Sequence, residues 1–280
     1  MPSTKATGAV LTDAEGGMGQ SRTLQVAAGL GAILAWIIIW AWLTRPGGPV
    51  PTLYFPAPDD VWAKFVRMWQ RPYIGSTLPD HILASLYIVL TGWGLAALVG
   101  IPLGIAMAWW KRLKWIVFPT FQLIRPVPPL AWIPLTILWL GIGDSARISV
   151  VFIAALVPWL MNSMLAVYSV DRLLLDAART LGANDRQILA RVVCRTALPT
   201  LVAAARMALG NAWSTLVAAE ILAATAGLGY VAVNASQLLD TDVLLVAMFM
   251  IGILGICMTG LIGLTQNWLA PWSVLGARRD

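Results

Sequence analysis

Apolar residues gather in six long stretches of this chain, and most polar residues fall in the connectors between them. The stretches cover about residues 24–44, 82–110, 115–141, 147–168, 201–224 and 243–265. About 20 apolar residues in a helix cross the ~30 Å hydrocarbon core of a bilayer, where every backbone polar group must be satisfied within the protein. The pattern therefore predicts an all-α membrane protein with about six transmembrane helices.

Composition agrees with a membrane protein and excludes several kinds of function. Hydrophobic residues make up 59% of the 280 residues and charged residues 11%, against about 25% charged in soluble domains. The net charge of +6 is scattered over short connectors instead of one face, so nucleic acid is not expected as a partner. With one histidine, two cysteines without CxxC spacing and no GxxxxGK[ST] sequence, we expect no catalytic residue, no metal site and no cofactor in this chain.

Charge in the connectors predicts how the chain is oriented in the membrane. One set of connectors carries most of the basic residues: Lys5, Arg22, Lys111, Arg112, Lys114, Arg172, Arg179, Arg186, Arg191, Arg195, Arg278 and Arg279. The positive-inside rule places this set, and with it both termini and the 169–200 loop, in the cytoplasm of a bacterial inner-membrane protein. We expect a disordered cytoplasmic tail over residues 1–23, a transmembrane domain over 24–272 and a cytoplasmic tail over 273–280.

The first outer connector, about residues 45–80, contains an amphipathic pattern. Val61, Phe65, Met68 and Trp69 recur at helical spacing after Asp59, a residue suited to an N-cap. This predicts a short helix on the outer membrane surface, which either packs on the bundle or contacts a solute receptor.

A proline-rich segment interrupts the 115–141 stretch. Residues 125–129 read Arg-Pro-Val-Pro-Pro, and proline lacks the backbone donor that a straight helix needs. A break is therefore expected near the middle of the stretch. Either it lines a translocation path, because irregular backbone at membrane depth must face protein or a cavity, or the prolines form a turn between a surface helix and the true span, with Arg125 at the cytoplasmic interface.

The connector at 171–199 predicts a hook of two short helices. Leu173, Leu174, Ala177, Ala178 and Leu181 form one apolar stripe at helical spacing, and Gly182 follows as a helix-ending glycine. Asn184 and Gln187 form a capping-box pattern for a second helix, and Pro199 suits the first turn of the next membrane helix. The stripe needs an apolar surface, either on the cytoplasmic ends of its own bundle or in a groove on a partner.

The same connector resembles the EAA signature of binding-protein-dependent ABC importer permeases, with Asp176 in place of the usual Glu. The resemblance implies a type I permease fold and a coupling helix that sits in a cleft of the ATP-binding subunit. The residues it assigns to coupling are Asp176, Ala177, Ala178, Arg179, Leu181, Gly182, Ala183, Ile188, Leu198 and Pro199. It also implies these partners: a dimer of ATP-binding subunits that binds ATP and Mg, a second permease copy, a periplasmic or lipid-anchored solute-binding protein, and membrane lipid.

Other segments resemble the nitrate/sulfonate/taurine branch of these permeases, over about residues 80–272. They are residues 125–134, 139–143, 213–220 and 223–230, and the last two look most similar to taurine permeases. The resemblance implies import of taurine or another alkanesulfonate, with nitrate, bicarbonate, cyanate or a vitamin precursor as alternatives. A secondary transporter is the alternative of another class, and the chain lacks the inverted repeats and paired intramembrane ionisable residues typical of one.

Polar residues within the spans are the candidates for the translocation path: Arg125, Pro128, Trp132, Trp213, Ser214, Thr215 and Glu220. Glu220 is a carboxylate deep in an apolar stretch, where burying its charge costs about 2.5 kcal/mol or more. It either lies on the polar side of a pore-facing helix or sits near the outer interface, paired with Arg147 or a backbone donor.

Overall fold

The structure, a computed structural model, describes residues 6–45 and 47–269, and the regular secondary structure in these residues is helical. The prediction of an all-α protein is confirmed. The chain divides into two compact units, residues 1–64 and 65–280. The tail expected over residues 273–280 lies outside the described residues.

Helix α1 (Ala6–Leu43) makes up most of the first unit, and its segment from Leu24 onward is long and apolar enough to cross a membrane. The helical backbone of the structure begins at Ala6, and the disordered cytoplasmic tail expected over residues 1–23 stays a prediction. Extending an existing helix adds one hydrogen bond per residue without a new nucleation step. The apolar helix can therefore continue backward into a polar segment that has little helical tendency of its own.

Trp40 organises the chain that follows α1. Its Nε1 donates a hydrogen bond to the Pro56 carbonyl oxygen at 3.0 Å, and its ring centroid lies 5.4 Å from that of Phe55. The amphipathic helix expected in this connector is confirmed as α2 (Pro58–Gln70). It begins one residue earlier than predicted, so Asp59 lies in its first turn instead of capping it.

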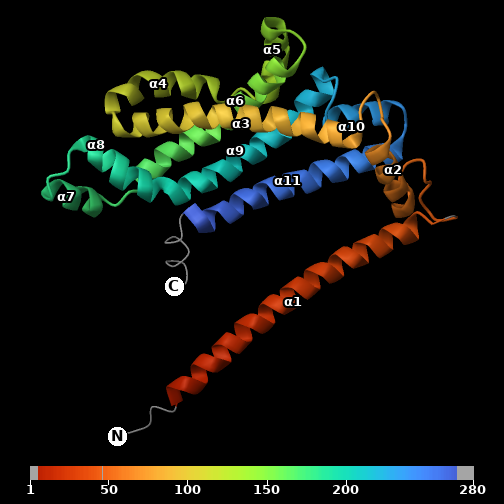
Figure 1. Ribbon diagram of the computed structural model, residues 1–280, viewed down its shortest axis with the longest axis horizontal. Coiled ribbons are helices and arrows are strands. Elements are labelled where there is room, and N and C mark those ends of the chain that lie inside the picture. Colours follow the sequence, from red (N-terminus) through yellow and green to blue (C-terminus); the bar gives the residue numbers. More distant parts are fainter. Residues whose placement is uncertain (1–5, 46, 270–280) are drawn as a thin grey trace. The chain divides into compact units, whose positions relative to one another are not determined.

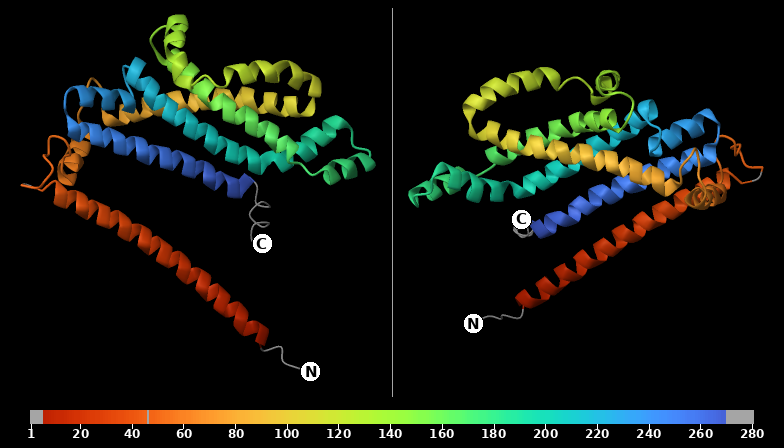
Figure 2. Two further views of the ribbon diagram at one scale, coloured as in Figure 1. Left: turned by 180° about the vertical axis from the view of Figure 1, so that it is seen from behind. Right: turned by 45° about the horizontal axis from the view of Figure 1, so that its top comes forward.

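Long helices form the bundle of the second unit: α3 (Leu78–Trp109), α6 (Asp144–Tyr168), α9 (Cys194–Ala223) and α11 (Thr241–Leu269). Figures 1 and 2 show α3, α6 and α9 running together. Helices α7 (Arg172–Thr180) and α8 (Asp185–Gln187) lie at one end of the bundle and α10 (Leu228–Gln237) at the other. In the described residues, five helices, α1 included, can cross a membrane by length and composition, and a sixth span arises if one bent pair is counted together.

Small residues bring α3 close to α6. Gly92, Ala96, Gly100 and Gly104 recur every four residues along one face of α3, and all four are buried. A Cβ atom added to Gly104 would lie 2.5 Å from the carbonyl oxygen of Leu160 on α6. The two backbones are therefore in contact. Membrane helices commonly pack through small residues in this way, because the hydrophobic effect does not drive helix association inside the bilayer.

The bent pair is the break expected in the 115–141 stretch. Helix α4 (Lys111–Ile124) packs along α3, and the chain then turns by 86° into the short 3-10 helix η1 (Pro129–Trp132) and helix α5 (Ile133–Leu140). Figure 1 shows α5 rising away from the α3–α4 pair. The prolines at positions 126, 128 and 129 account for the bend, because none of them can donate the hydrogen bond that would continue α4.

Candidate coupling and translocation sites

Helix α7 (Arg172–Thr180) is the first half of the hook at 171–199, and local signals fix both of its ends. The Asp171 side chain caps its start by accepting a hydrogen bond from the Leu173 backbone N–H at 2.9 Å. Gly182, just beyond its end, has φ +82°, a conformation that L-residues with a Cβ seldom adopt. The predicted helix and its terminating glycine are both confirmed.

The second half of the hook begins with the predicted capping box. The Gln187 N–H donates to Asn184 Oδ1, and the Asn184 N–H donates to Gln187 Oε1, each at 2.9 Å. Helix α8 (Asp185–Gln187) then passes through a π-helical segment, Ile188–Val193, directly into α9.

Pro199 does not stand where it was predicted. It was expected in the first turn of a new membrane helix, but the helix runs unbroken from Asp185 to Leu222, so Pro199 lies in its interior. A helix that already has a cap at Asn184 has no need of a second start. Leu198, the other distal coupling candidate, is half-buried in the same helix.

The hook has an inner apolar face that packs on its own bundle. Leu175, Ala178 and Ala183 contact a buried cluster that includes Val167 and Ile188. Ala178 and Ile188, two of the predicted coupling residues, therefore hold the hook in place from within. This is the first of the two surfaces proposed for the apolar stripe.

The hook also has an outer apolar face, formed by Leu173, Leu174, Ala177 and Leu181, which the described residues of this chain leave exposed. Leu173 is 73% exposed and Leu181 87% exposed. Asp176 and Arg179 form an exposed ion pair beside it, at 3.3 Å, which contributes little to stability. The stripe is thus divided, and only Ala178 of its five members turns inward.

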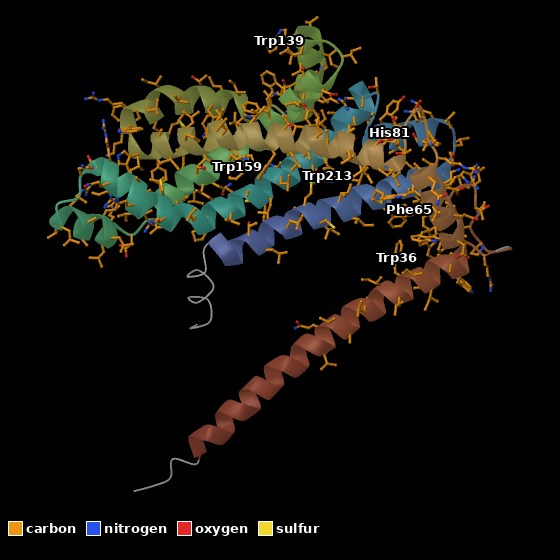
Figure 3. The ribbon with its side chains drawn as sticks, viewed as in Figure 1. Trp36, Phe65, His81, Trp139, Trp159 and Trp213 are labelled. Atoms are coloured by element: carbon orange, nitrogen blue, oxygen red, sulfur yellow. The ribbon has the colours of Figure 1, made fainter. Side chains whose placement is uncertain are left out.

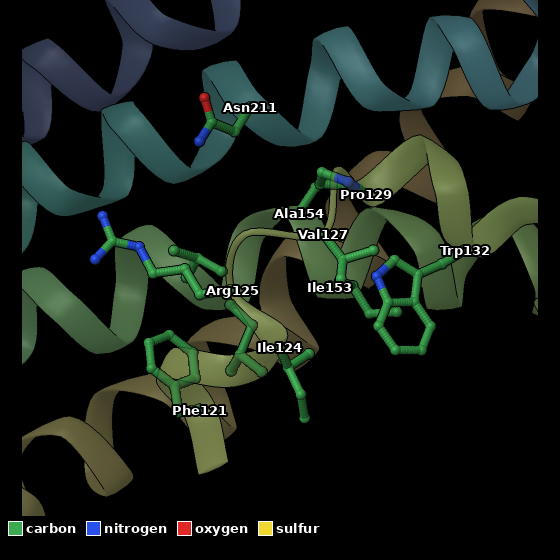
Figure 4. A pocket seen from close by; sticks show the side chains of 11 residues that line it. Phe121, Ile124, Arg125, Val127, Pro129, Trp132, Ile153, Ala154 and Asn211 are labelled. Carbon is green, nitrogen blue, oxygen red and sulfur yellow. The ribbon is translucent and has the colours of Figure 1, made fainter. Parts of the chain in front are cut away.

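A cavity of about 330 Å³ lies at the break between α4 and η1, against α6 and α9 (Figure 4). Its walls are formed by Phe121, Ile124, Arg125, Val127, Pro129, Trp132, Ile153, Ala154, Leu156, Val157 and Asn211. Arg125 and Trp132, two candidates for the translocation path, thus line the same cavity. Pro128 is exposed next to this wall, and Asn211 is a member that the sequence analysis missed.

The candidates on α9 fall in different environments. Ser214, exposed, lies three residues after Asn211 and so on the same side of the helix, and Thr215 is half-buried. Trp213 is buried, and its Nε1 donates to the Ile251 carbonyl oxygen of α11 at 3.1 Å. Trp213 therefore joins α9 to α11, which Figure 3 shows side by side near its label.

Glu220 lies outside the cavity, in a separate polar cluster, and is 1% exposed. Ser85 Oγ on α3 donates to Glu220 Oε1 at 2.6 Å, and the Gly229 N–H donates to Oε2 at 2.8 Å. Ser85 Oγ in turn accepts a hydrogen bond from the Leu228 N–H at 2.9 Å. Of the two interpretations of Glu220, pairing with a backbone donor describes its contacts.

Glu220 and Ser85 thus bind the first turn of α10, and two further side chains bind the loop before it, residues 224–227. His81 Nδ1 accepts from the Gly227 N–H at 3.2 Å, and its Nε2 donates to the Tyr73 carbonyl oxygen at 3.1 Å. Arg147, 4% exposed, donates to the Ala226 carbonyl oxygen at 3.0 Å and pairs with Asp144. We call Ser85, Glu220, His81 and Arg147 the loop clamp. Figure 3 places His81 at the α10 end of the bundle.

Tyr73 lies next to the loop clamp, in the connector before α3. Burial, and secondarily the negative charge of Asp240, raises the pKa of its phenol. Because both causes favour the neutral form, Tyr73 carries no charge at neutral pH.

Comparisons with known proteins all indicate the same family. Residues 100–273 match the family described as binding-protein-dependent transport system inner membrane component. The taurine transport system permease protein TauC of Escherichia coli (strain K12) is 35% identical over 249 residues, which cover 89% of this chain and 90% of TauC. The bicarbonate transport system permease protein CmpB of Synechococcus elongatus is 29% identical over 244 residues, which cover 86% and 88%.

The fold has a solved counterpart as well. A chain of the MetNI methionine ABC transporter in an inward-facing conformation aligns with a TM-score of 0.54 and 22% identity, covering 66% of this chain and 95% of that one. The protein therefore belongs to the family of binding-protein-dependent transport system inner membrane components. It is a multi-pass inner-membrane permease subunit of an ABC importer, without catalytic activity or cofactor, and a separate ATPase binds the ATP.

Proposed function

We propose that this permease imports a small organic anion, taurine or another alkanesulfonate, delivered by a periplasmic or lipid-anchored binding protein. The similarity to TauC and to the putative aliphatic sulfonates permease SsuC of Escherichia coli, 34% identical over 222 residues, supports this solute class. The similarity to CmpB supports bicarbonate as the second candidate. Nitrate, cyanate and vitamin precursors are further alternatives from the sequence resemblance alone.

The outer face of the hook is the proposed docking surface for the ATPase. Its four apolar side chains lie on a helix whose inner face is fixed to the bundle, so a partner that grips them also grips the membrane helices. An amphipathic helix in an apolar groove is a common mode of recognition. This exposed face, beside an ordered inner face, is the observation that carries the proposal.

The assembly and orientation follow from the same proposal. Two permease copies pair with two ATP-binding subunits, and both hooks lie in the cytoplasm, as the positive-inside rule predicts. The translocation path runs by the cavity at the α4–η1 break, past Arg125, Trp132 and Ser214. Pro128 shapes the break, while Trp213, Thr215 and Glu220 support the path from within the bundle.

Substitution of Leu181 tests the docking surface. Leu181→Asp should leave the permease inserted and folded, because the side chain contacts little of its own chain, but should weaken ATPase association. A buried leucine contributes about 1.5–3 kcal/mol, so the loss should be roughly 10- to 100-fold in affinity. Leu181→Met, which keeps an apolar side chain, is the matched control and should associate normally.

Import by cells carrying the cognate ATPase and binding protein gives the second measurement. Sulfonate uptake should stop on ATP depletion, survive an uncoupler and disappear with Leu181→Asp. Normal uptake with that variant would show that the hook does not dock on the ATPase. Labelling of a Leu181→Cys variant only from the periplasm would show the same. Uptake that stops when the uncoupler is added would favour a secondary transporter.

A further inference from the structure

The cavity at the α4–η1 break has apolar walls and a few polar groups. Most of the lining side chains are aliphatic or aromatic, including Phe121 of α4 and Ile153 and Val157 of α6. Its volume of about 330 Å³ is at the lower end of the range for ligand pockets, roughly 300–1,000 Å³. It is therefore suited to a small molecule that has an apolar part.

The polar side chains of the cavity offer mainly hydrogen-bond donors. Within the described residues, the Arg125 side chain forms no hydrogen bond or ion pair, so its guanidinium is available to a ligand. Trp132 Nε1 is buried and has no hydrogen-bond partner, which costs free energy unless a ligand accepts from it. Figure 4 shows Arg125 and Asn211 toward one side of the cavity and Trp132 toward the other.

The lining contains a cation but no carboxylate, and the Asn211 carboxamide is its one side-chain acceptor. An anion that accepts hydrogen bonds from a guanidinium and an indole N–H fits these donors, because a planar guanidinium binds oxyanions through paired bonds. A ligand ammonium group would find no opposite charge in this lining and would be repelled by the Arg125 cation. A polar anion without an alkyl group, such as bicarbonate, would gain nothing from the apolar walls.

We propose that this cavity is a solute site of the permease itself, that it binds the sulfonate group of short alkanesulfonates through Arg125, Trp132 and Asn211, and that it prefers unsubstituted alkanesulfonates to taurine. This specificity rests on the proposed function of sulfonate import. It predicts that the permease, and not the binding protein alone, discriminates between solutes.

Binding to the purified full-length permease in nanodiscs of phosphatidylcholine tests the site, with ethanesulfonate, taurine and bicarbonate as probes. Ethanesulfonate should bind saturably, taurine several-fold more weakly and bicarbonate not measurably. Arg125→Ala should weaken ethanesulfonate binding roughly tenfold or more, the loss expected for a hydrogen bond to a charged group. Trp132→Phe should weaken it about fivefold, and Arg112→Ala, an exposed cation on the same helix, should leave it unchanged.

Several outcomes would overturn the site. They are the absence of saturable ethanesulfonate binding, binding that Arg125→Ala does not change in a monodisperse protein, and taurine binding as tight as that of ethanesulfonate. A lipid phosphate could use the same donors, so the titration is repeated in nanodiscs that contain phosphatidylglycerol. Full competition by this lipid would identify a headgroup site and refute the solute site.

Import by the complete transporter separates this inference from the proposed function. If ATP-driven sulfonate import continues at the normal rate in Arg125→Ala, the cavity assignment fails and the proposed function stands. If the complete transporter imports no sulfonate while the purified permease binds ethanesulfonate through Arg125, the proposed function fails and the cavity assignment stands.

Discussion

Removing the Glu220 carboxyl group should destabilise the permease more than any change on its exposed surface. In Glu220→Ala, Ser85 Oγ–H and the Gly229 N–H lose their acceptors at 2.6 Å and 2.8 Å. Both donors are buried, and each stranded donor costs about 1–3 kcal/mol. The expected loss is therefore about 2–6 kcal/mol in the free energy of unfolding, before any cost of the cavity that the shorter side chain leaves.

The two controls separate hydrogen bonding from other effects of the substitution. Glu220→Gln keeps the shape of the side chain, but its NH₂ group can accept from neither donor, so one of the two bonds is lost and the cost should be about 1–3 kcal/mol. Ser214→Ala, on the exposed side of the same helix, should change stability by no more than about 0.5 kcal/mol.

The measurement is the free energy of unfolding of each purified variant in mixed micelles, with protein recovered from the membrane as a second readout. The expected order of stability is wild type and Ser214→Ala, then Glu220→Gln, then Glu220→Ala. If Glu220→Ala unfolds like wild type but loses import, Glu220 contacts solute in the translocation path, and the structural role derived from the loop clamp is wrong.

Two glycines provide further predictions. Gly104→Ala should lower the free energy of unfolding by about 1–3 kcal/mol or more, because it overpacks against Leu160, and should lower the recovery of folded protein. Gly94→Ala, with open space around it, should be tolerated. Equal recovery of the two variants would refute close packing of α3 on α6. Gly182→Val should cost about 1–2 kcal/mol by forcing a left-handed conformation and reduce transport but not membrane insertion. Gly182→Asn should have a smaller effect, because Asn tolerates this conformation, and equal transport by both variants would show that the turn is not needed.

Local signals made the hook predictable from sequence. Gly182 and the Asn184–Gln187 pair each act within a few residues of their partners, so spacing alone identifies these helix ends. The cap at Asp171 acts over the same short distance but was not among the predictions. The break after Arg125 was predictable for the same reason, since a run of prolines removes backbone donors whatever surrounds it.

The loop clamp could not be predicted in this way. Ser85 and Glu220 are 135 residues apart in the sequence, and His81 and Gly227 are 146 apart. Each polar residue could be recognised as unusual in an apolar stretch, but the pattern does not identify its partner. For Glu220 the sequence left two interpretations open, and the contact with the Gly229 N–H matches the one that pairs it with a backbone donor.

The close approach of α3 and α6 had a signal that was overlooked. Gly92, Ala96, Gly100 and Gly104 repeat at four-residue spacing, which is typical of membrane helices whose backbones touch. Asn211 is different, because a single amide on a long apolar helix does not indicate which cavity it faces. Its role depends on the bend of α4 against α5, which is a property of the folded chain.

The continuity of one helix joins the two proposed sites. The helix that starts at Asp185 in the hook carries Asn211 in the wall of the cavity, 26 residues further on by the numbering, or about 39 Å at 1.5 Å per residue. A continuous helix of this kind would transmit a displacement of the hook to the cavity wall. The π-helical segment Ile188–Val193 and Pro199 are the irregular parts of this connection, and Ile188 and Val193 are packed in the buried cluster under the hook. Because this packing resists bending of the π-helical segment, we expect closure of the ATPase to move the hook and the Asn211 side of the cavity together. Arg125, which directly follows α4, stays with the α3–α4 pair.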